Sequence, residues 1–520
     1  TPEISNDPDV DDGVDGDNIT FSLPEMPGEE SGTVKRIGNL YTPGEDVVLY
    51  FTRPDEERWK ISFQLMDFFN NTLSTTTSIF AAGPGVDTLS RSFGSSLPEG
   101  YYVVKCKVFK GANDDFFEQY DFRFAVLNAQ TDTTAPAGVP YFGMCTHLNA
   151  GTTAWTVQLM QKYGVHMQRT GFRWVENTNS SGNYELTDDY KLGLNSGLNR
   201  DIKTQGIILY GNPSIETDPG FDGVTFENGN FPGIVTERDA FADYAFNLVD
   251  DLTNSTGPVV NYFEVWNEWT AGTGIETDDG DLPLNNETPA TTDNTPDNYY
   301  QLLAAVHGEL EGLSVNNAEI KLIGLGGENP GKHLAEITEM LGDGLLNYCD
   351  IISVHPYRQP LAPEASDDVR QNLYDEIMVI SDLMESSSVP SGDDETIWFS
   401  EIGWPTWPGR AGVSETDQAR YLVRTHVIMR SIEKVENITW YDFKDDGWGF
   451  ETYVHETTSE ITEGGYWSDQ ENNFGIVMHE KYNMAPKPAV VAYAILIRML
   501  ELTTPDLATK ITHASLDDTT

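Results

Sequence analysis

The first part of the chain shows a regular alternation of apolar and polar residues in short stretches. Residues 59–65 read WKISFQL and residues 101–108 read YYVVKCKV, so apolar side chains recur at every second position. Alternation of this kind predicts strands with one buried face. Strands are expected at residues 32–38, 46–52, 58–68, 86–93, 101–109 and 117–126. Their number and spacing predict an immunoglobulin-like β-sandwich over residues 20–130.

Beyond this region, apolar runs alternate with longer amphipathic stretches. Buried strands are expected at residues 141–147, 165–171, 205–211, 262–268, 319–326, 350–355, 396–401 and 437–443. Helices are expected at residues 154–163, 238–252, 298–313, 367–384, 416–431 and 487–501. Strands that alternate with helices predict a parallel sheet. This arrangement predicts a (β/α)₈ (TIM) barrel over residues 138–510, joined to the sandwich by a linker at residues 128–140.

The net charge of the chain excludes some classes of binding partner. The chain carries 31 Lys and Arg against 83 Asp and Glu, a formal net charge of −52. Nucleic acids and anionic membranes would repel such a protein. Residues 1–19 are rich in Asp and Gly without the glycine spacing of a calcium loop, so an acidic disordered linker is expected there. The overall acidity fits a marine or halophilic setting, in which salt weakens self-repulsion.

Composition also bears on location and cofactors. No apolar run reaches the roughly 18–20 residues of a membrane span. The chain begins with Thr1, and we expect a monomer that is secreted, periplasmic or on the cell surface, with its signal segment removed. Cys106, Cys145 and Cys349 follow no disulfide or metal-ligand spacing and are expected to be small buried side chains. No metal and no cofactor is expected.

Two glutamates stand where apolar strands end. Glu268 closes the run 262–268 (YFEVWNE), and Glu401 closes the run 396–401 (TIWFSE) before a Gly/Pro turn. In a barrel of this type, reactive side chains gather at the C-terminal ends of the strands. Burial raises the pKa of a carboxyl group, as a general acid near neutral pH requires. Other polar or aromatic residues at strand ends are His147, Arg169, Asn212, His355, Tyr357 and Trp440.

Several motifs carry a resemblance to a known group of enzymes. They are VWNE at 265–268, SVHPY at 353–357, FSEIGWP at 399–405, WYDFKDDG at 440–447, NFGIV at 473–477 and PKPA at 486–489. Over residues 141–505 the chain resembles the clan of retaining (β/α)₈ glycoside hydrolases (clan A), whose acid/base lies on strand four and nucleophile on strand seven. It is most similar to the β-xylosidase/α-iduronidase type. It departs from that type in having its expected sandwich at the N-terminus rather than the C-terminus.

The resemblance implies roles for five residues. Glu401 would be the nucleophile and Glu268 the acid/base. Asn267 would bind the 2-hydroxyl of the sugar. Arg169 and Tyr357 would hold Glu401 ionised, because a nearby cation and a donated hydrogen bond both lower the pKa of a carboxyl group. Glu268 would be largely protonated, with its carboxyl group about 5–5.5 Å from that of Glu401.

Further substrate contacts follow from the same resemblance. Trp440 would lie under the reacting sugar, with a non-proline cis peptide between Trp440 and Tyr441. His355 would bind substrate, and His147 is either a substrate contact or a core histidine. Glu264 is expected to be a buried carboxylate with a partner, because it lies deeper on the same strand as Glu268.

The predicted function is a retaining glycoside hydrolase acting on a plant or algal polysaccharide or its oligosaccharides. A transglycosylase and a non-catalytic glycan-binding protein remain open as alternatives. Four cations follow strands five to eight and would suit an anionic glycan, but scattered ion pairs at the rim are the preferred explanation: Arg358, Arg410, Lys444 and Lys332.

Overall fold

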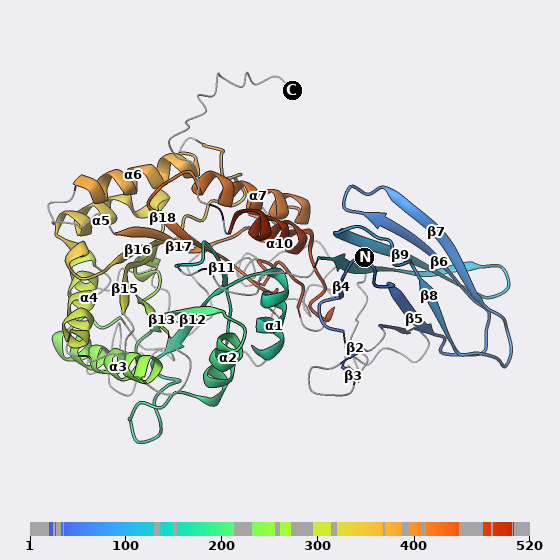
Figure 1. Cartoon of the computed structure of the whole chain (residues 1–520), viewed down its shortest axis with the longest axis horizontal. Coiled ribbons are helices and arrows are strands. Elements are labelled where there is room, and N and C mark those ends of the chain that lie inside the picture. Colours follow the sequence, from blue (N-terminus) through green and yellow to red (C-terminus); the bar gives the residue numbers. More distant parts are fainter. Residues whose placement is uncertain are drawn as a thin grey trace, which may run out of the picture.

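The computed structural model contains two β-sheet units that are joined in sequence (Figure 1). It describes residues 20–23, 26–27, 33–34, 36–128, 136, 138–148, 153–212, 231–254, 260–271, 295–311, 313, 320–367, 370–386, 395–407, 409, 411–446, 472–479, 482–501 and 503. The expected acidic linker at residues 1–19 lies outside the described residues.

The N-terminal unit consists of two main sheets that share one core. One sheet has the order β1-β5-β8, with β1 (Thr20–Ser22), β5 (Val48–Thr52) and β8 (Thr88–Ser92). The other has the order β4-β10-β9-β6-β7, with β4 (Leu40–Tyr41), β6 (Trp59–Asp67), β7 (Thr72–Phe80), β9 (Gly100–Lys110) and β10 (Asp115–Val126). A separate pair joins β2 (Met26–Pro27) and β3 (Thr33–Val34). Leu49 and Phe51 from the first sheet pack with Trp59 and Phe63 from the second.

The alternation of apolar and polar residues predicted most strands of this unit, and the strands that it missed or misplaced have simple causes. β6 has the burial pattern expected of a strand with one buried face, with Trp59, Ile61 and Phe63 completely buried. β7 was not predicted, because it is a threonine-rich edge strand that is exposed along most of its length. The strand predicted at 32–38 is wrong in extent: the described strand there is Thr33–Val34 alone. The immunoglobulin-like topology and the domain boundaries stay predictions.

The second unit is a closed barrel of eight parallel strands. They are β11 (Phe142–Cys145), β12 (Met167–Arg173), β13 (Lys203–Leu209), β14 (Tyr262–Val265), β15 (Lys321–Glu328), β16 (Ile351–Val354), β17 (Thr396–Ile402) and β18 (Val435–Trp440). β18 pairs with β11, which closes the sheet. All eight lie where apolar runs predicted them, so the predicted TIM barrel is confirmed at the level of its strands.

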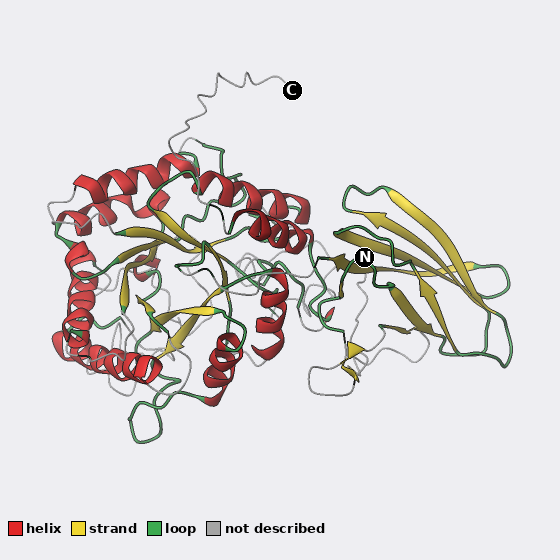
Figure 2. Cartoon of the chain, in the orientation of Figure 1, coloured by secondary structure: helices red, strands yellow, loops and turns green. Residues whose placement is uncertain are grey.

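Helices surround the barrel strands (Figure 2). They are α1 (Thr153–Tyr163), α2 (Asp188–Leu198), α3 (Val235–Asn254), α4 (Pro296–Leu310), α5 (Pro330–Gly342), α6 (Leu373–Ser386), α7 (Glu415–Met429) and α10 (Pro488–Leu500). Side-chain caps begin several of them: Thr295 accepts the N–H of Asn298 in α4, and Ser414 accepts that of Asp417 in α7. Among the described residues, no helix combines the length and apolar character needed to cross a membrane.

The two units contact each other along α7, α10 and the loop before α10 (Figure 1). Arg123 of β10 pairs with Glu415 of α7 at 2.6 Å, and Glu99 pairs with Arg498 of α10 at 2.5 Å. Asn483 donates hydrogen bonds to the carbonyl of Arg36 and the side chain of Asn39. These polar contacts, together with apolar side chains of β4, β9 and β10 that belong to the same core cluster as the barrel, hold the N-terminal unit against the outside of the barrel.

Candidate active site

The two predicted glutamates lie close together at the C-terminal ends of barrel strands. Glu401 is on β17 and Glu268 follows β14. A carboxylate oxygen of each, together with a ring nitrogen of His355, lie within 4.8 Å of one another. Both side chains reach solvent, with 29% of Glu268 and 12% of Glu401 exposed. The pair is thus accessible to a ligand.

Glu401 accepts hydrogen bonds at both carboxylate oxygens. Arg169 of β12 donates to Oε1 at 2.5 Å, and the Tyr357 hydroxyl donates to Oε2 at 2.8 Å. The structure therefore brings together the three residues expected to meet there. One oxygen faces a fixed cation and the other a phenol, so the position of the carboxylate is well determined.

Arg169 connects this carboxylate to the interior of the barrel. Its Nε donates to Glu264 at 2.8 Å, and its Nη2 donates to Oδ1 of Asn267 at 2.8 Å. Burial by itself lowers the pKa of Arg169, but the charges of Glu264 and Glu401 outweigh it and raise that pKa. Glu264 is completely buried and paired, as expected. The amide of Asn267 is oriented by Arg169, which leaves its role toward a sugar hydroxyl a prediction.

Glu268 is held in position by an unusual backbone and by His355. Its φ is 46°, and its N–H donates to the carbonyl of Gly326 at 2.6 Å. Trp266 also has a positive φ, of 65°, so the chain leaves the regular geometry of a strand just before the glutamate. Nδ1 of His355 lies 2.8 Å from Oε1 of Glu268.

The prediction that His355 binds substrate is wrong. Its side chain is completely buried, because it lies between Glu268 on one side and Ser400, 2.9 Å from Nε2, on the other. Burial lowers the pKa of His355, but the charge of Glu401 and the hydrogen bond with Glu268 outweigh it and raise the pKa. His355 therefore contacts a candidate catalytic residue instead of a ligand.

The prediction that Trp440 lies under a sugar is also wrong. Trp440 is completely buried and stacks on Trp404 and His426, in the layer between barrel and helices. The non-proline cis peptide joins Tyr441 and Asp442 rather than Trp440 and Tyr441. Tyr441 is partly exposed, and its ring packs edge-on against those of His147 and Tyr357. It takes the position at the cleft that was expected for Trp440.

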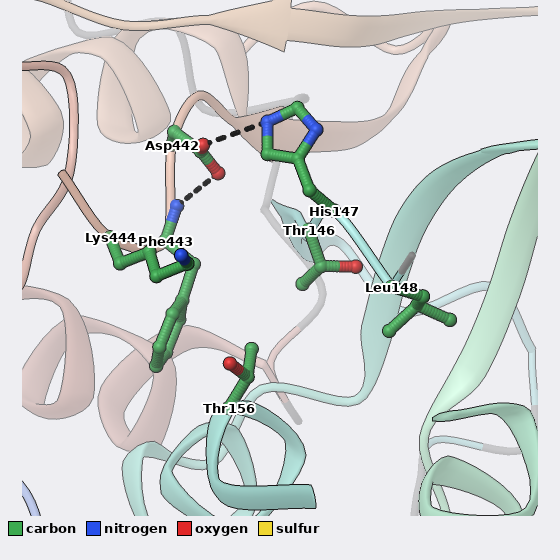
Figure 3. A pocket seen from close by; sticks show the side chains of 7 residues that line it. All are labelled: Thr146, His147, Leu148, Thr156, Asp442, Phe443 and Lys444. Atoms are coloured by element: carbon green, nitrogen blue, oxygen red, sulfur yellow. Dashed lines mark hydrogen bonds and ion pairs between the residues drawn. The ribbon is translucent and has the colours of Figure 1, made fainter. Parts of the chain in front are cut away.

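His147 lies beside a small pocket near the same strand ends (Figure 3). The pocket is lined by Thr146, His147, Leu148, Thr156, Asp442, Phe443 and Lys444. Nε2 of His147 is 3.0 Å from the buried carboxylate of Asp442, and 40% of the histidine side chain is exposed. Burial lowers the pKa of His147, but the charge of Asp442 and its hydrogen bond raise it to about 9. His147 is thus a half-exposed, positively charged group and not a core histidine.

As far as they are described, the four cations do not gather beside the two glutamates. Arg358 is buried and occupied by Glu376 and the carbonyls of Ala365 and Gln371. Lys444 is buried, Lys332 is exposed on α5, and Arg410 lies outside the described residues. Asn212, also named from its strand end, is buried and donates to Thr178.

Three buried residues of the site were missed from the sequence: Ser400, Glu328 and Asp442. Ser400 directly precedes Glu401, and no role was predicted for it from the sequence. Glu328 ends β15, which was predicted to stop at residue 326, so the strand-end rule was applied two residues too early. Burial raises the pKa of Glu328 to about 8, and the charge of Glu268 acts in the same direction.

Within the part of the chain that the structure describes, two groups could bind a divalent cation on distance alone. One is Glu268, His355 and Glu401, and the other is His147, Asp442 and Asp446; in each, donor atoms lie within 4.8 Å of one another. In the first group every member already has a hydrogen-bonding partner in the site. Its chemistry without a metal is direct: one carboxylate can attack, and the other can give and take a proton.

No known protein-family model matches the chain, and no curated protein matches it. Solved structures share its fold. A family 39 glycoside hydrolase from the gut symbiont Bacteroides cellulosilyticus WH2 superposes with a TM-score of 0.63 at 22% identity, covering 90% of this chain and 82% of that one.

More distant structures include an exo-β-1,4-mannosidase from Opitutaceae bacterium strain TAV5, with a TM-score of 0.47 at 13% identity over 72% of this chain and 62% of that one. A GH2 β-galacturonidase from Eisenbergiella tayi has a TM-score of 0.41 at 13% identity, over 93% and 71% of the two chains. Of the three, the family 39 enzyme is the one with a TM-score above 0.5, and at 22% identity that likeness shows a shared fold.

Proposed function

We propose that the chain is a retaining glycoside hydrolase that cleaves its substrate by double displacement. The observation that supports this most strongly is the close approach of Glu268 and Glu401, whose nearest carboxylate oxygens are within 4.8 Å. Retaining enzymes hold their carboxyl groups about 5–5.5 Å apart, whereas inverting enzymes need about 6.5–9.5 Å to admit a water molecule between them. The short separation favours retention.

The two glutamates divide the reaction between them. Glu401 attacks the anomeric carbon while Glu268 gives its proton to the leaving oxygen, and a glycosyl-enzyme forms. Glu268 then takes a proton from water, whose oxygen attacks the same carbon and releases Glu401. Arg169 and Tyr357 orient the attacking carboxylate through the bonds already described.

The finer identity rests on several features together. The sequence motifs and the shared fold with a family 39 glycoside hydrolase support an enzyme of the β-xylosidase/α-iduronidase type. We propose a plant or algal polysaccharide, or its oligosaccharides, as substrate and a secreted monomer as the acting form. The N-terminal unit is proposed to be an immunoglobulin-like spacer, because its polar contacts with α7 and α10 fix it to the barrel.

The experiment is a kinetic series on aryl glycosides of both anomers. Glu401→Ala should lower kcat by on the order of 10⁴-fold or more, about 5 kcal/mol of barrier. Glu268→Ala should slow poor leaving groups far more than activated ones, since only the poor ones need a proton. Glu339→Ala, on the exposed face of α5, is the matched control and should leave the rate unchanged.

Product analysis completes the test. NMR of the first-formed product should show the anomer of the substrate. An inverted product, or near-normal turnover by Glu401→Ala, would contradict the proposal. Products longer than the substrate would identify a transglycosylase, and failure of the wild-type protein to cleave any glycan it binds would identify a binding protein.

A further inference from the structure

A chain of buried hydrogen bonds runs behind the two glutamates. Ser400 Oγ lies 2.8 Å from Oε1 of Glu264 and 2.9 Å from Nε2 of His355, and Nδ1 of His355 lies 2.8 Å from Glu268. Glu264, Ser400 and His355 are all completely buried. A Cβ atom on Gly327 would lie 2.3 Å from Nε2 of His355, so the backbone of β15 packs directly against the ring. The ring therefore has little freedom to turn.

The positions of the protons follow from the partners. Glu264 is the counter-ion of Arg169 and also accepts from Gln205 at 3.1 Å, so it acts as a carboxylate acceptor toward Ser400. The single hydroxyl proton of Ser400 must then point to Glu264. The oxygen of Ser400 is left as an acceptor, which requires a proton on Nε2 of His355.

We infer that Ser400 and Glu264 lock His355 as the tautomer protonated at Nε2, so that its Nδ1 always turns a lone pair or a shared proton toward Glu268. This inference rests on the proposed role of Glu268 as acid/base. Ser400 and Glu264 are positioning residues, since they act through His355 and do not reach the substrate. When His355 is neutral, its only ring proton is on Nε2, so its Nδ1 cannot donate a hydrogen bond to a Glu268 carboxylate. The contact between Nδ1 and Glu268 is therefore favourable only when one proton lies between the two atoms.

The lock has a different effect in each step. Before the first step, the proton shared between Glu268 and His355 is retained at the site and passes to the leaving oxygen. Glu268 is then a carboxylate whose Oε1 faces the Nδ1 lone pair, an unfavourable contact at 2.8 Å. Taking a proton from water relieves that contact. The lock thus makes Glu268 a better base in the second step and restores the starting state.

Other charged groups also face this pair and set the background for its titration. Glu401 of β17 approaches Nδ1 of His355 to 3.7 Å, Arg169 of β12 lowers the pKa of His355, and Glu328 of β15 is coupled electrostatically to Glu268. Tyr357, Tyr210, Lys332 and His333 complete the ionisable surroundings. These groups are unchanged in the variants below, so a difference in pH profile between the variants can be assigned to the tautomer of His355.

The tautomer can be measured without any substrate. In protein labelled with ¹⁵N-histidine, the ring resonances of His355 are identified by their loss in His355→Gln. At a pH high enough to remove the shared proton, wild-type His355 should show the Nε2–H tautomer. Ser400→Ala removes the acceptor, so the Nδ1–H tautomer, which can donate to Glu268, should appear. An Nδ1–H tautomer in the wild-type protein, or no change in Ser400→Ala, would overturn the inference even if no glycoside is ever cleaved.

The kinetic consequence is a change in the pH profile. In Ser400→Ala a neutral His355 can stabilise the Glu268 carboxylate, so the basic limb of kcat/KM should move down by about one pH unit. Ser400→Thr keeps the hydroxyl and should restore the limb. Ser381→Ala is the matched control, because Ser381 is a buried serine on the helix α6 and does not hold the backbone that packs against His355. An unmoved limb in Ser400→Ala, or an equal shift in Ser381→Ala, would overturn the inference.

Discussion

Glu328→Gln measures how much the buried carboxyl group of Glu328 changes the free energy of unfolding. Glu328 ends β15, is 1% exposed, and accepts the N–H of Thr270 at 2.9 Å, two residues beyond Glu268. Burial raises its pKa to about 8 from the ordinary 4.5, against the opposing effect of the bonds from Thr270. Glutamine has nearly the same shape and can keep the bond to Thr270, but it does not ionise.

The sign and size of the effect follow from proton binding. Between pH 4.5 and about 8 the folded protein holds the Glu328 proton and the unfolded chain does not, so this group makes the free energy of unfolding fall as pH rises. A difference of about 3.5 pH units corresponds to a free-energy loss on the order of 5 kcal/mol. Compared with wild type, Glu328→Gln should therefore gain stability across this window and gain nothing further above it.

Urea unfolding from about pH 5 to about pH 9 measures this difference. Tryptophan fluorescence follows the barrel, since Trp59 is the only tryptophan among the first 150 residues. Glu339→Gln removes a carboxylate from the exposed face of α5 and should show no such window. If the stabilities of Glu328→Gln and wild type differ by a constant amount over the whole range, the reasoning is wrong.

Two further predictions test the charges around the site. Arg169→Gln leaves Glu264 buried without its cation and should lower the free energy of unfolding by about 3–5 kcal/mol. The double variant Arg169→Gln/Glu264→Gln should recover much of that loss. Additive losses of the two single variants in urea unfolding would contradict this prediction. Asp442→Asn removes the charge that raises the pKa of His147 to about 9, so the pKa of His147 should fall in an NMR titration. An unchanged pKa would show that another group holds the proton.

The fold was predictable where burial alone shapes the sequence. Strands buried on both sides give continuous apolar runs, which is why all eight barrel strands were located. α2 was missed because Gly193, Asn195 and Gly197 are weak helix formers and its helical state depends on packing. β7 was missed because an exposed edge strand has no apolar face to produce alternation. Tertiary contacts determine whether such segments form a helix or a strand, and the local sequence pattern carries no information on those contacts.

The site was predictable as a set of strand ends but not as a set of contacts. The rule that polar residues gather at the C-terminal ends of barrel strands indicated Glu268, Glu401, Arg169 and Tyr357, which the structure brings together. The same rule misplaced His355, because it does not distinguish a side chain at the surface of the cleft from one a layer below. Burial depth depends on how far each strand extends relative to its neighbours.

A local irregularity in β17 explains both the missed Ser400 and the misplaced Trp440. Phe399 pairs with Ile438 and Ile402 pairs with Trp440, so β17 advances three residues while β18 advances two. The extra residue lets Ser400 and Glu401 both face the inside of the barrel, although neighbours in a regular strand face opposite sides. It also returns Ile402 to the outer core, and Trp440 lies with it there. Alternation counted along the sequence cannot reveal a bulge, and this bulge places the serine of the His355 lock directly behind the candidate nucleophile.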